Sequence, residues 1–211
     1  MRDLTSRYAA AAAAIDAANS DDPTTVLVRG KETPLALVHG QLAVEWIERL
    51  VDEPDEALLL AGRAHHLRRW QLRRDSYPDG RAGYLRWRRD QKARHANEIA
   101  VILAPLGYAS DEIERVQRLI RREPTEGSQT VEDAACLVFI ETQLGGLSER
   151  MDHALLIDVI RKTARKMSAD GLRFVAEIPM DDRARNILAE ALADSGSAIP
   201  SGERTGTKWV E

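Results

Sequence analysis

Helical periodicity runs through almost the whole chain and constrains its fold more than any other feature. Over residues 35–50, for example, Leu35, His39 and Trp46 share the one-sided spacing of an amphipathic α-helix. Glycines, prolines and short polar capping residues separate such segments. Only residues 24–31 alternate like a strand, and because one isolated strand cannot make a sheet, we expect an extended linker there. The sequence therefore predicts an all-α fold, a compact single-domain bundle of about eight helices.

The glycines, prolines and polar capping residues also set the expected boundaries of the helices and of the domain. With 211 residues the chain is long enough for one sizeable core, so we expect a single helical domain over residues 1–194. The Ser, Gly and Thr content after that point predicts a flexible C-terminal tail over residues 195–211. The helices are expected over residues 4–19, 34–50, 54–68, 81–106, from 110 onward, 130–144, 152–171 and 183–193.

Composition is that of an ordinary soluble protein. The chain is 44% hydrophobic and 30% charged, and no apolar run approaches the roughly 20 residues that a transmembrane helix needs. The alanine run 9–14 predicts a helix and not a signal peptide, because Arg7 adjoins it and Asp16 interrupts it. The single cysteine, Cys136, lies in an apolar run and is expected to be a buried thiol. These features predict a cytoplasmic protein without a membrane segment.

Positive charge is concentrated in one stretch of an otherwise acidic protein. The net charge is -4, yet residues 63–94 contain eleven Arg or Lys against three Asp. A local patch of this kind favours a small anionic partner that contains phosphate, and nucleic acid is not expected. Arginines would contact the phosphate and aromatic rings would stack on the ligand. The candidate substrate-binding residues are Arg69, Trp70, Tyr77, Arg81, Tyr84 and Arg88.

Four histidines fall on three consecutive expected helices, at positions 39, 65, 66 and 95. A lone histidine on an apolar face is more often a core residue, but imidazole is also the commonest metal ligand at neutral pH. His95 and Glu98, three apart on the 81–106 helix, could meet at one metal or share a proton, unless their stripe is a solvated charged face. Asp133 could equally belong to a capping box with Thr130.

Six strings spread over most of the chain are distinctive together: AIDAANSDDP (14–23), RAHHLRRW (63–70), RDSYPDGRAGYLRWR (74–88), HANEIA (95–100), VEDAACLVFIE (131–141) and IRKTARKMSADG (160–171). In these strings the chain resembles the uncharacterised family known as domain of unknown function 4202. The family usually has Gln where this chain has His65, so His66 corresponds to the family's histidine.

The chain is more distantly similar to HD-type metal-dependent phosphohydrolases, all-helical enzymes that hold their metal with a His, a His-Asp pair and a late Asp. His66 stands where that pattern has Asp. The resemblance implies a divalent metal ion, Zn, Mn or Fe, bound by His39, His66, His95 and Asp133. It also implies that Glu132 is the general base, or a residue that supports the ligands.

The leading functional hypothesis is a metal-dependent hydrolase of a small phosphorylated metabolite or nucleotide. Two alternatives use the same residues. In the first, the arginines and aromatic rings of a non-catalytic module bind an anion or a partner, and the histidines are structural. In the second, an HD-type di-iron oxygenase would use His95, Glu98 and Glu132.

Overall fold

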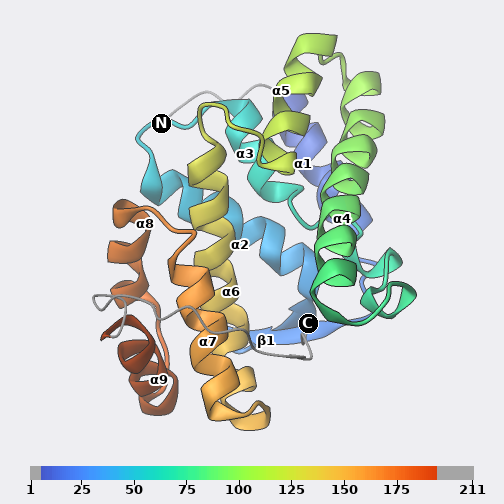
Figure 1. Ribbon diagram of the computed structural model, residues 1–211. Helices are drawn as coiled ribbons and strands as arrows, with labels where there is room; N and C mark the ends of the chain where they lie inside the picture. The colour runs from blue at the N-terminus through green and yellow to red at the C-terminus, as the bar shows by residue number, and fades with distance from the viewer. Residues whose placement is uncertain (1–5, 194–211) are drawn as a thin grey trace.

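The computed structural model describes residues 6–193 and confirms the all-α class (Figure 1). Short 3-10 turns, η1 (Arg69–Gln71), η2 (Arg74–Ser76), η3 (Ala104–Leu106) and η4 (Val175–Glu177), join some of the α-helices. The α-helices within the described part of the chain are α1 (Ser6–Asn19), α2 (Leu35–Leu50), α3 (Glu56–Arg63), α4 (Gly80–Leu103), α5 (Ser110–Arg121), α6 (Ser128–Arg150), α7 (His153–Ala164), α8 (Ala169–Phe174) and α9 (Asp182–Ala193).

Residues 25–34 form a β-hairpin, so the prediction of an extended linker was wrong. Strand β1 (Thr25–Val28) pairs antiparallel with β2 (Lys31–Pro34). Arg29 and Gly30 make the turn with φ values of 49° and 78°, and two positive φ values suit a tight hairpin turn. The second strand was missed because KETP lacks apolar alternation, and because Pro34 looked like the first residue of a helix that in fact begins at Leu35.

Other boundaries moved for local reasons. The helix expected to reach residue 68 ends at Arg63, and Arg68 takes a left-handed conformation. The helix expected over residues 152–171 is two helices, because Ser168 accepts a hydrogen bond from the backbone N–H of Gly171 and caps α8. Helix α6 begins at Ser128, ahead of the expected start. The predicted tail at 195–211 lies outside the described residues.

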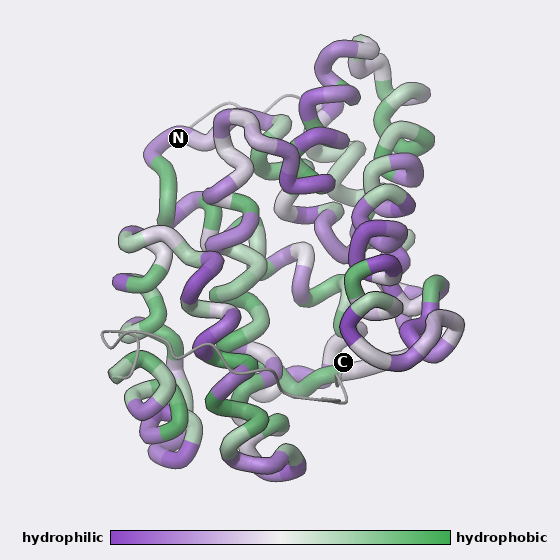
Figure 2. The backbone as a smooth tube through the Cα atoms, in the orientation of Figure 1, coloured by the Kyte–Doolittle hydropathy of each residue, from purple (hydrophilic) through white to green (hydrophobic). Residues whose placement is uncertain are grey.

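Helix α6 runs through the middle of the molecule (Figure 1). It packs on α2, which also packs on α3, while α4 packs on α5 and α7 packs on α9. Apolar residues of these helices, such as Ile47, Leu60, Ile99 and Leu137, are fully buried between them. Figure 2 shows the apolar positions along α6, whereas the middle of α4 is hydrophilic.

Two further expectations hold. The alanine run forms α1, and Cys136 is a buried free thiol. None of the helices in the range 6–193 has the length and apolar character required to cross a membrane.

Candidate metal centre and adjoining cationic pocket

Four imidazole rings from three parts of the fold come together beside the core. His39 comes from α2, His65 and His66 from the turn after α3, and His95 from α4. The ring centroids of His65 and His66 are 4.2 Å apart, those of His39 and His66 are 4.9 Å apart, and those of His66 and His95 are 6.4 Å apart. One ring nitrogen from each of His39, His65 and His66 lies within 4.8 Å of the others. We call these four residues the histidine cluster.

A glycine allows the cluster to form. At Gly40, next to His39, a Cβ atom would stand 2.4 Å from the carbonyl oxygen of Arg63. No side chain could be accommodated at that distance without a shift of the backbone. Helix α2 therefore approaches the end of α3 closely enough for His39 to meet the two histidines that follow Arg63.

Backbone carbonyls set the tautomers of two of the rings. His65 Nδ1 lies 2.7 Å from the carbonyl oxygen of Gly62, and His95 Nδ1 lies 2.8 Å from that of Leu67. A carbonyl can only accept, so each Nδ1 carries the proton and donates it. Each Nε2 is left with a lone pair. Both Nε2 atoms are buried and have no hydrogen-bond partner within residues 6–193.

A chain of hydrogen bonds assigns the other two tautomers. The Thr142 hydroxyl donates to the carbonyl of Val138 at 2.7 Å, so it must accept from His39 Nε2 at 3.0 Å. A contact of 3.4 Å from Gln143 to the same nitrogen is longer than the usual range. His39 Nδ1 then carries a lone pair and accepts from His66 Nδ1 at 2.8 Å. His66 Nε2 is consequently the third lone pair of the cluster.

The cluster is electrically neutral at neutral pH. Burial, followed by the charge of Arg122, lowers the pKa of His65 to about 3. Burial, followed by the charge of Arg69, does the same for the pKa of His95. Burial, His65 and Arg69 hold the pKa of His39 and of His66 well below the ordinary value. Neutral imidazoles with available lone pairs are the form that binds transition metals.

Asp133, a predicted ligand, has other partners. Its carboxylate accepts from the backbone N–H of Ser168 at 2.8 Å, from the Ser168 hydroxyl at 2.6 Å and from the Gln129 amide at 2.9 Å. The alternative prediction, a capping box with Thr130, was wrong, because α6 starts at Ser128 with Gly127 as its N-cap. Asp133 instead holds the beginning of α8.

The two glutamates predicted to lie in the site, Glu98 and Glu132, are both ion-paired. Glu98 lies 2.7 Å from Arg94 and 3.6 Å from Arg68, and it makes no hydrogen bond to His95. Glu132 lies 2.9 Å from Arg122. Its charge nevertheless reaches the histidine cluster, where it partly opposes the lowering of the His65 pKa by burial and Arg122.

The six predicted substrate-binding residues do not share one site. Arg69 stacks on the buried ring of Trp87, 4.5 Å from its centroid, and its charge lowers the pKa of all four clustered histidines. Arg88 stacks on Tyr84 at 5.8 Å and lines a pocket described below.

The remaining predicted residues lie elsewhere. The Tyr77 hydroxyl donates to Asp90 at 3.0 Å, Trp70 is half-buried, and Arg81 is exposed. The structure therefore brings Arg69 to the cluster and Arg88 to the pocket.

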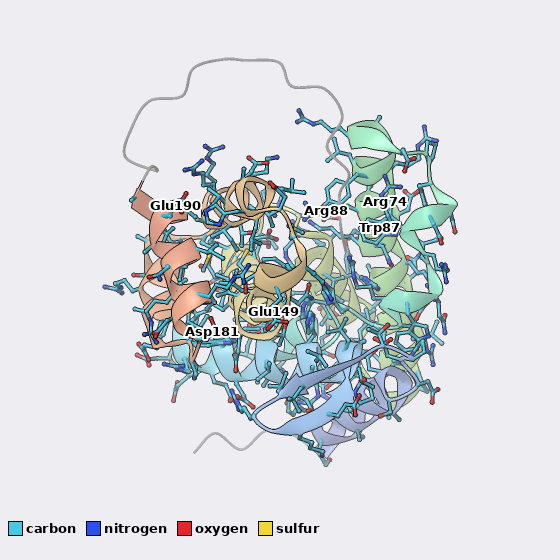
Figure 3. The ribbon with its side chains drawn as sticks, turned by 90° about the horizontal axis from the view of Figure 1, so that it is seen from below. Arg74, Trp87, Arg88, Glu149, Asp181 and Glu190 are labelled. Atoms are coloured by element: carbon cyan, nitrogen blue, oxygen red, sulfur yellow. The ribbon has the colours of Figure 1, made fainter. Side chains whose placement is uncertain are left out.

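An open pocket of about 680 Å³ lies near the cluster, since two of its lining residues, Arg122 and Glu132, act electrostatically on His65. Figure 3 shows Arg88 on the side of α4 that is turned toward α6. Three cationic residues that line this pocket, Lys92, Arg122 and Lys166, were not predicted from the sequence, because they come from three separate parts of the chain. The spacing of Arg88, Lys92 and His95, which places them on one helix face, could have indicated that Lys92 belongs to the site. The pocket is lined by Arg88, Lys92, Arg122, Pro124, Thr125, Ser128, Gln129, Glu132 and Lys166, and we call it the cationic pocket.

Comparison with known proteins agrees with the sequence resemblance. The family described as "Domain of unknown function (DUF4202)" matches residues 9–188. No curated protein and no solved structure matches the chain. Since the match extends over most of its length, the chain belongs to the family of domain of unknown function 4202.

Proposed function

We propose that this protein is a metal-dependent hydrolase of a small phosphorylated metabolite or nucleotide, in the manner of HD-type enzymes. The observation that carries the proposal is the pair of buried Nε2 atoms of His65 and His95. A buried polar atom without a partner costs roughly 1–3 kcal/mol. A divalent metal ion is the kind of partner that such a lone pair binds, whereas an ordinary core histidine would already have a partner on each side.

One ring nitrogen from each of His39, His65 and His66 already lies within 4.8 Å of the others, and the His95 ring, 6.4 Å from that of His66, would have to move closer to share the same ion. His65, His66 and His95 would bind it through Nε2, and His39 would orient His66 through the bond between their Nδ1 atoms. Three imidazoles suit Zn, Mn or Fe and leave positions for water and substrate. This set adds His65 and leaves Asp133 with Ser168. When bound, the ion would lower the pKa of a water molecule and polarise a phosphoryl oxygen.

The surrounding charges fit an anionic substrate. The Arg69 guanidinium acts electrostatically on every histidine of the cluster, so it can hold a phosphoryl oxygen beside them. Burial alone would raise the pKa of Glu132, but Arg122, Lys92 and Lys166 outweigh that effect and leave the pKa lowered. A carboxylate with a lowered pKa is a weak base, so we assign Glu132 to orienting Arg122.

The test is elemental analysis of protein purified without chelator or affinity metal. We expect stoichiometric Zn, Mn or Fe in the wild type and its loss in His65→Ala and His95→Ala. His153→Ala is the matched control, because His153 is exposed, pairs with Glu190 and lies outside the cluster. Loaded wild type should hydrolyse a phosphomonoester or a nucleotide, and the two cluster variants should not.

Two results would overturn the proposal. Metal-free wild type whose melting temperature ignores added Zn, Mn and Fe would favour the non-catalytic binding module. Bound iron with a visible colour and oxygen consumption, without phosphatase activity, would favour the di-iron oxygenase.

A further inference from the structure

We propose that the cationic pocket is the site that binds the phosphoryl end of the substrate, through Arg88, Lys92, Arg122, Lys166 and the first turn of α6. The ligand class is a small molecule with a terminal phosphate or diphosphate. The catalytic meaning of this inference rests on the proposed function, but anion binding by the pocket does not require a metal.

The pocket has more positive than negative charge. Four cationic side chains line it, and Glu132 is the only carboxylate among its lining residues. Glu132 is committed to Arg122 at 2.9 Å. Arg88, Lys92 and Lys166 form no ion pair with any residue in the range 6–193. Arg88, Lys92 and Arg122 are partly buried and Lys166 is exposed, and partly buried cations are costly to hold together unless an anion compensates them.

Burial makes the cost specific at Lys92. Burial, followed by the charge of Arg122 and more weakly by those of Arg88 and Lys166, lowers the pKa of Lys92 to about 8, with Glu132 opposing them. The folded protein thus disfavours the ammonium that it places in the pocket. A bound phosphate would reverse this balance by adding two negative charges beside it.

Arg122 is held in place before any ligand arrives. Its backbone is left-handed with φ of 60°, a conformation that residues other than glycine seldom adopt. Its Nη1 donates to the carbonyls of Leu119 and Ile120 at 3.2 and 3.4 Å, and its Nε donates to Glu132 at 2.9 Å. A guanidinium fixed in this way loses little freedom on binding an anion.

The first turn of α6 also favours an anion, through its backbone N–H groups. Ser128 and Gln129 line the pocket, and the N-cap position is Gly127, which offers no side chain to cap the helix. The N–H of Ser128 donates to the Thr125 carbonyl at 3.1 Å, which leaves those of Gln129 and Thr130 for a ligand. The 23-residue helix also directs the positive end of its dipole toward this point. The helix end and the side chains thus independently favour an anion here.

The pocket is placed to serve the histidine cluster. Lys92 lies one turn before His95 on α4, and the charges of Arg122 and Glu132 both act on His65. A phosphoryl group bound by Lys92 and Arg122 would therefore lie beside the cluster. The volume of about 680 Å³ is within the roughly 300–1,000 Å³ of small-molecule sites, which suits a metabolite better than a polymer.

The test is calorimetric titration of inorganic phosphate and of pyrophosphate into chelator-treated, metal-free protein. We expect binding by the wild type and a loss of affinity of about tenfold or more in Lys92→Met and in Lys166→Met. Lys92→Arg should retain binding because it retains the charge. Arg86→Gln is the matched control, since Arg86 is exposed on the same helix and does not line the pocket.

Equal affinity in the wild type and in folded Lys92→Met and Lys166→Met, or no binding by the wild type, would overturn the pocket proposal. Folding of each variant is checked by its circular dichroism and melting. The two proposals fail separately. Phosphate binding by a protein that never takes up metal would refute only the metalloenzyme, and metal binding without phosphate binding would refute only the pocket.

Discussion

The carboxylate of Asp133 accepts hydrogen bonds from both the backbone N–H and the hydroxyl of Ser168, at 2.8 and 2.6 Å. These bonds fasten α8 to α6 across 35 residues of sequence. A Cβ atom on Gly171 would stand 2.6 Å from the carboxyl carbon of Asp133, so the beginning of α8 is packed directly against this side chain. Asp133 therefore stabilises the packing of α8 against α6.

We expect Asp133→Ala to lower the free energy of unfolding by about 2 kcal/mol, because the buried donors on Ser168 lose their acceptor. Urea unfolding measures this change, and elemental analysis of the same sample should find the wild-type metal content. A folded Asp133→Ala protein that has lost its metal would restore Asp133 to the ligand set.

The close approach at Gly40 predicts a second stability effect. Gly40→Ala would press a methyl group against the carbonyl of Arg63, and we expect a loss of about 1–3 kcal/mol together with weaker metal binding. Gly145→Ala on α6 is the control, since a Cβ there meets nothing within 4 Å and alanine favours a helix. Thermal melting and metal titration of the two variants compare them. Identical behaviour would mean that the approach of α2 to α3 does not hold the cluster together.

Thr142 tests the tautomer chain. Thr142→Val keeps the shape of the side chain but removes the acceptor for His39 Nε2, and we expect metal affinity to fall about 10- to 100-fold. Thr163→Val is matched to it, because the Thr163 hydroxyl likewise donates four residues back, to Val159, but on α7. Competition with a coloured chelator measures both affinities, and an equal loss in the two variants would remove the specific role of Thr142.

Lys92 predicts a dependence of stability on pH. Its pKa is about 8 in the folded protein and 10.5 ordinarily, so between these values the unfolded chain binds a proton that the folded chain has released. Stability should therefore rise with pH through this window, because the neutral amine is buried at less cost than the ammonium and is not repelled by Arg122, Arg88 and Lys166. Phosphate affinity should fall over the same window.

We expect Lys92→Met to be more stable than the wild type at neutral pH by about 1 kcal/mol and to lose the rise above pH 8. Melting temperatures of metal-free protein across that range measure both effects. Parallel curves for the two proteins would show that the burial of Lys92 carries no energetic cost.

Local patterns predicted most of the helices but not the contacts between them. The helix starts near residues 152 and 183 were predicted, and there Asp152 and Asp181 accept the backbone N–H groups of Leu155 and Ala184. The hairpin partner of β1 was not readable, because its residues lack alternation. Asp133 looked like a local cap since its true partner, Ser168, is far along the chain.

The candidate site shows the same limit. The resemblance to HD-type enzymes predicts His39, His66 and His95 as ligands, and His65 is not among them because the family of this chain usually has Gln there. The lone pair on His65 Nε2 is available because Nδ1 donates to the carbonyl of Gly62, a contact that a sequence pattern does not show. The count of charges over residues 63–94 identified Arg88 but not Arg122 or Lys166, because these two residues reach the cationic pocket from other elements.

The hydrogen-bond chain through the cluster has a direction. The carbonyl of Val138 has no proton to give, so the protons of Thr142, His39 and His66 must all point toward it. Reversing one bond would require reversing every other bond and would leave that carbonyl facing a lone pair. The main chain of α6 thus decides that His66 carries its lone pair on Nε2, and a substitution that leaves these hydrogen bonds in place cannot move that lone pair to Nδ1.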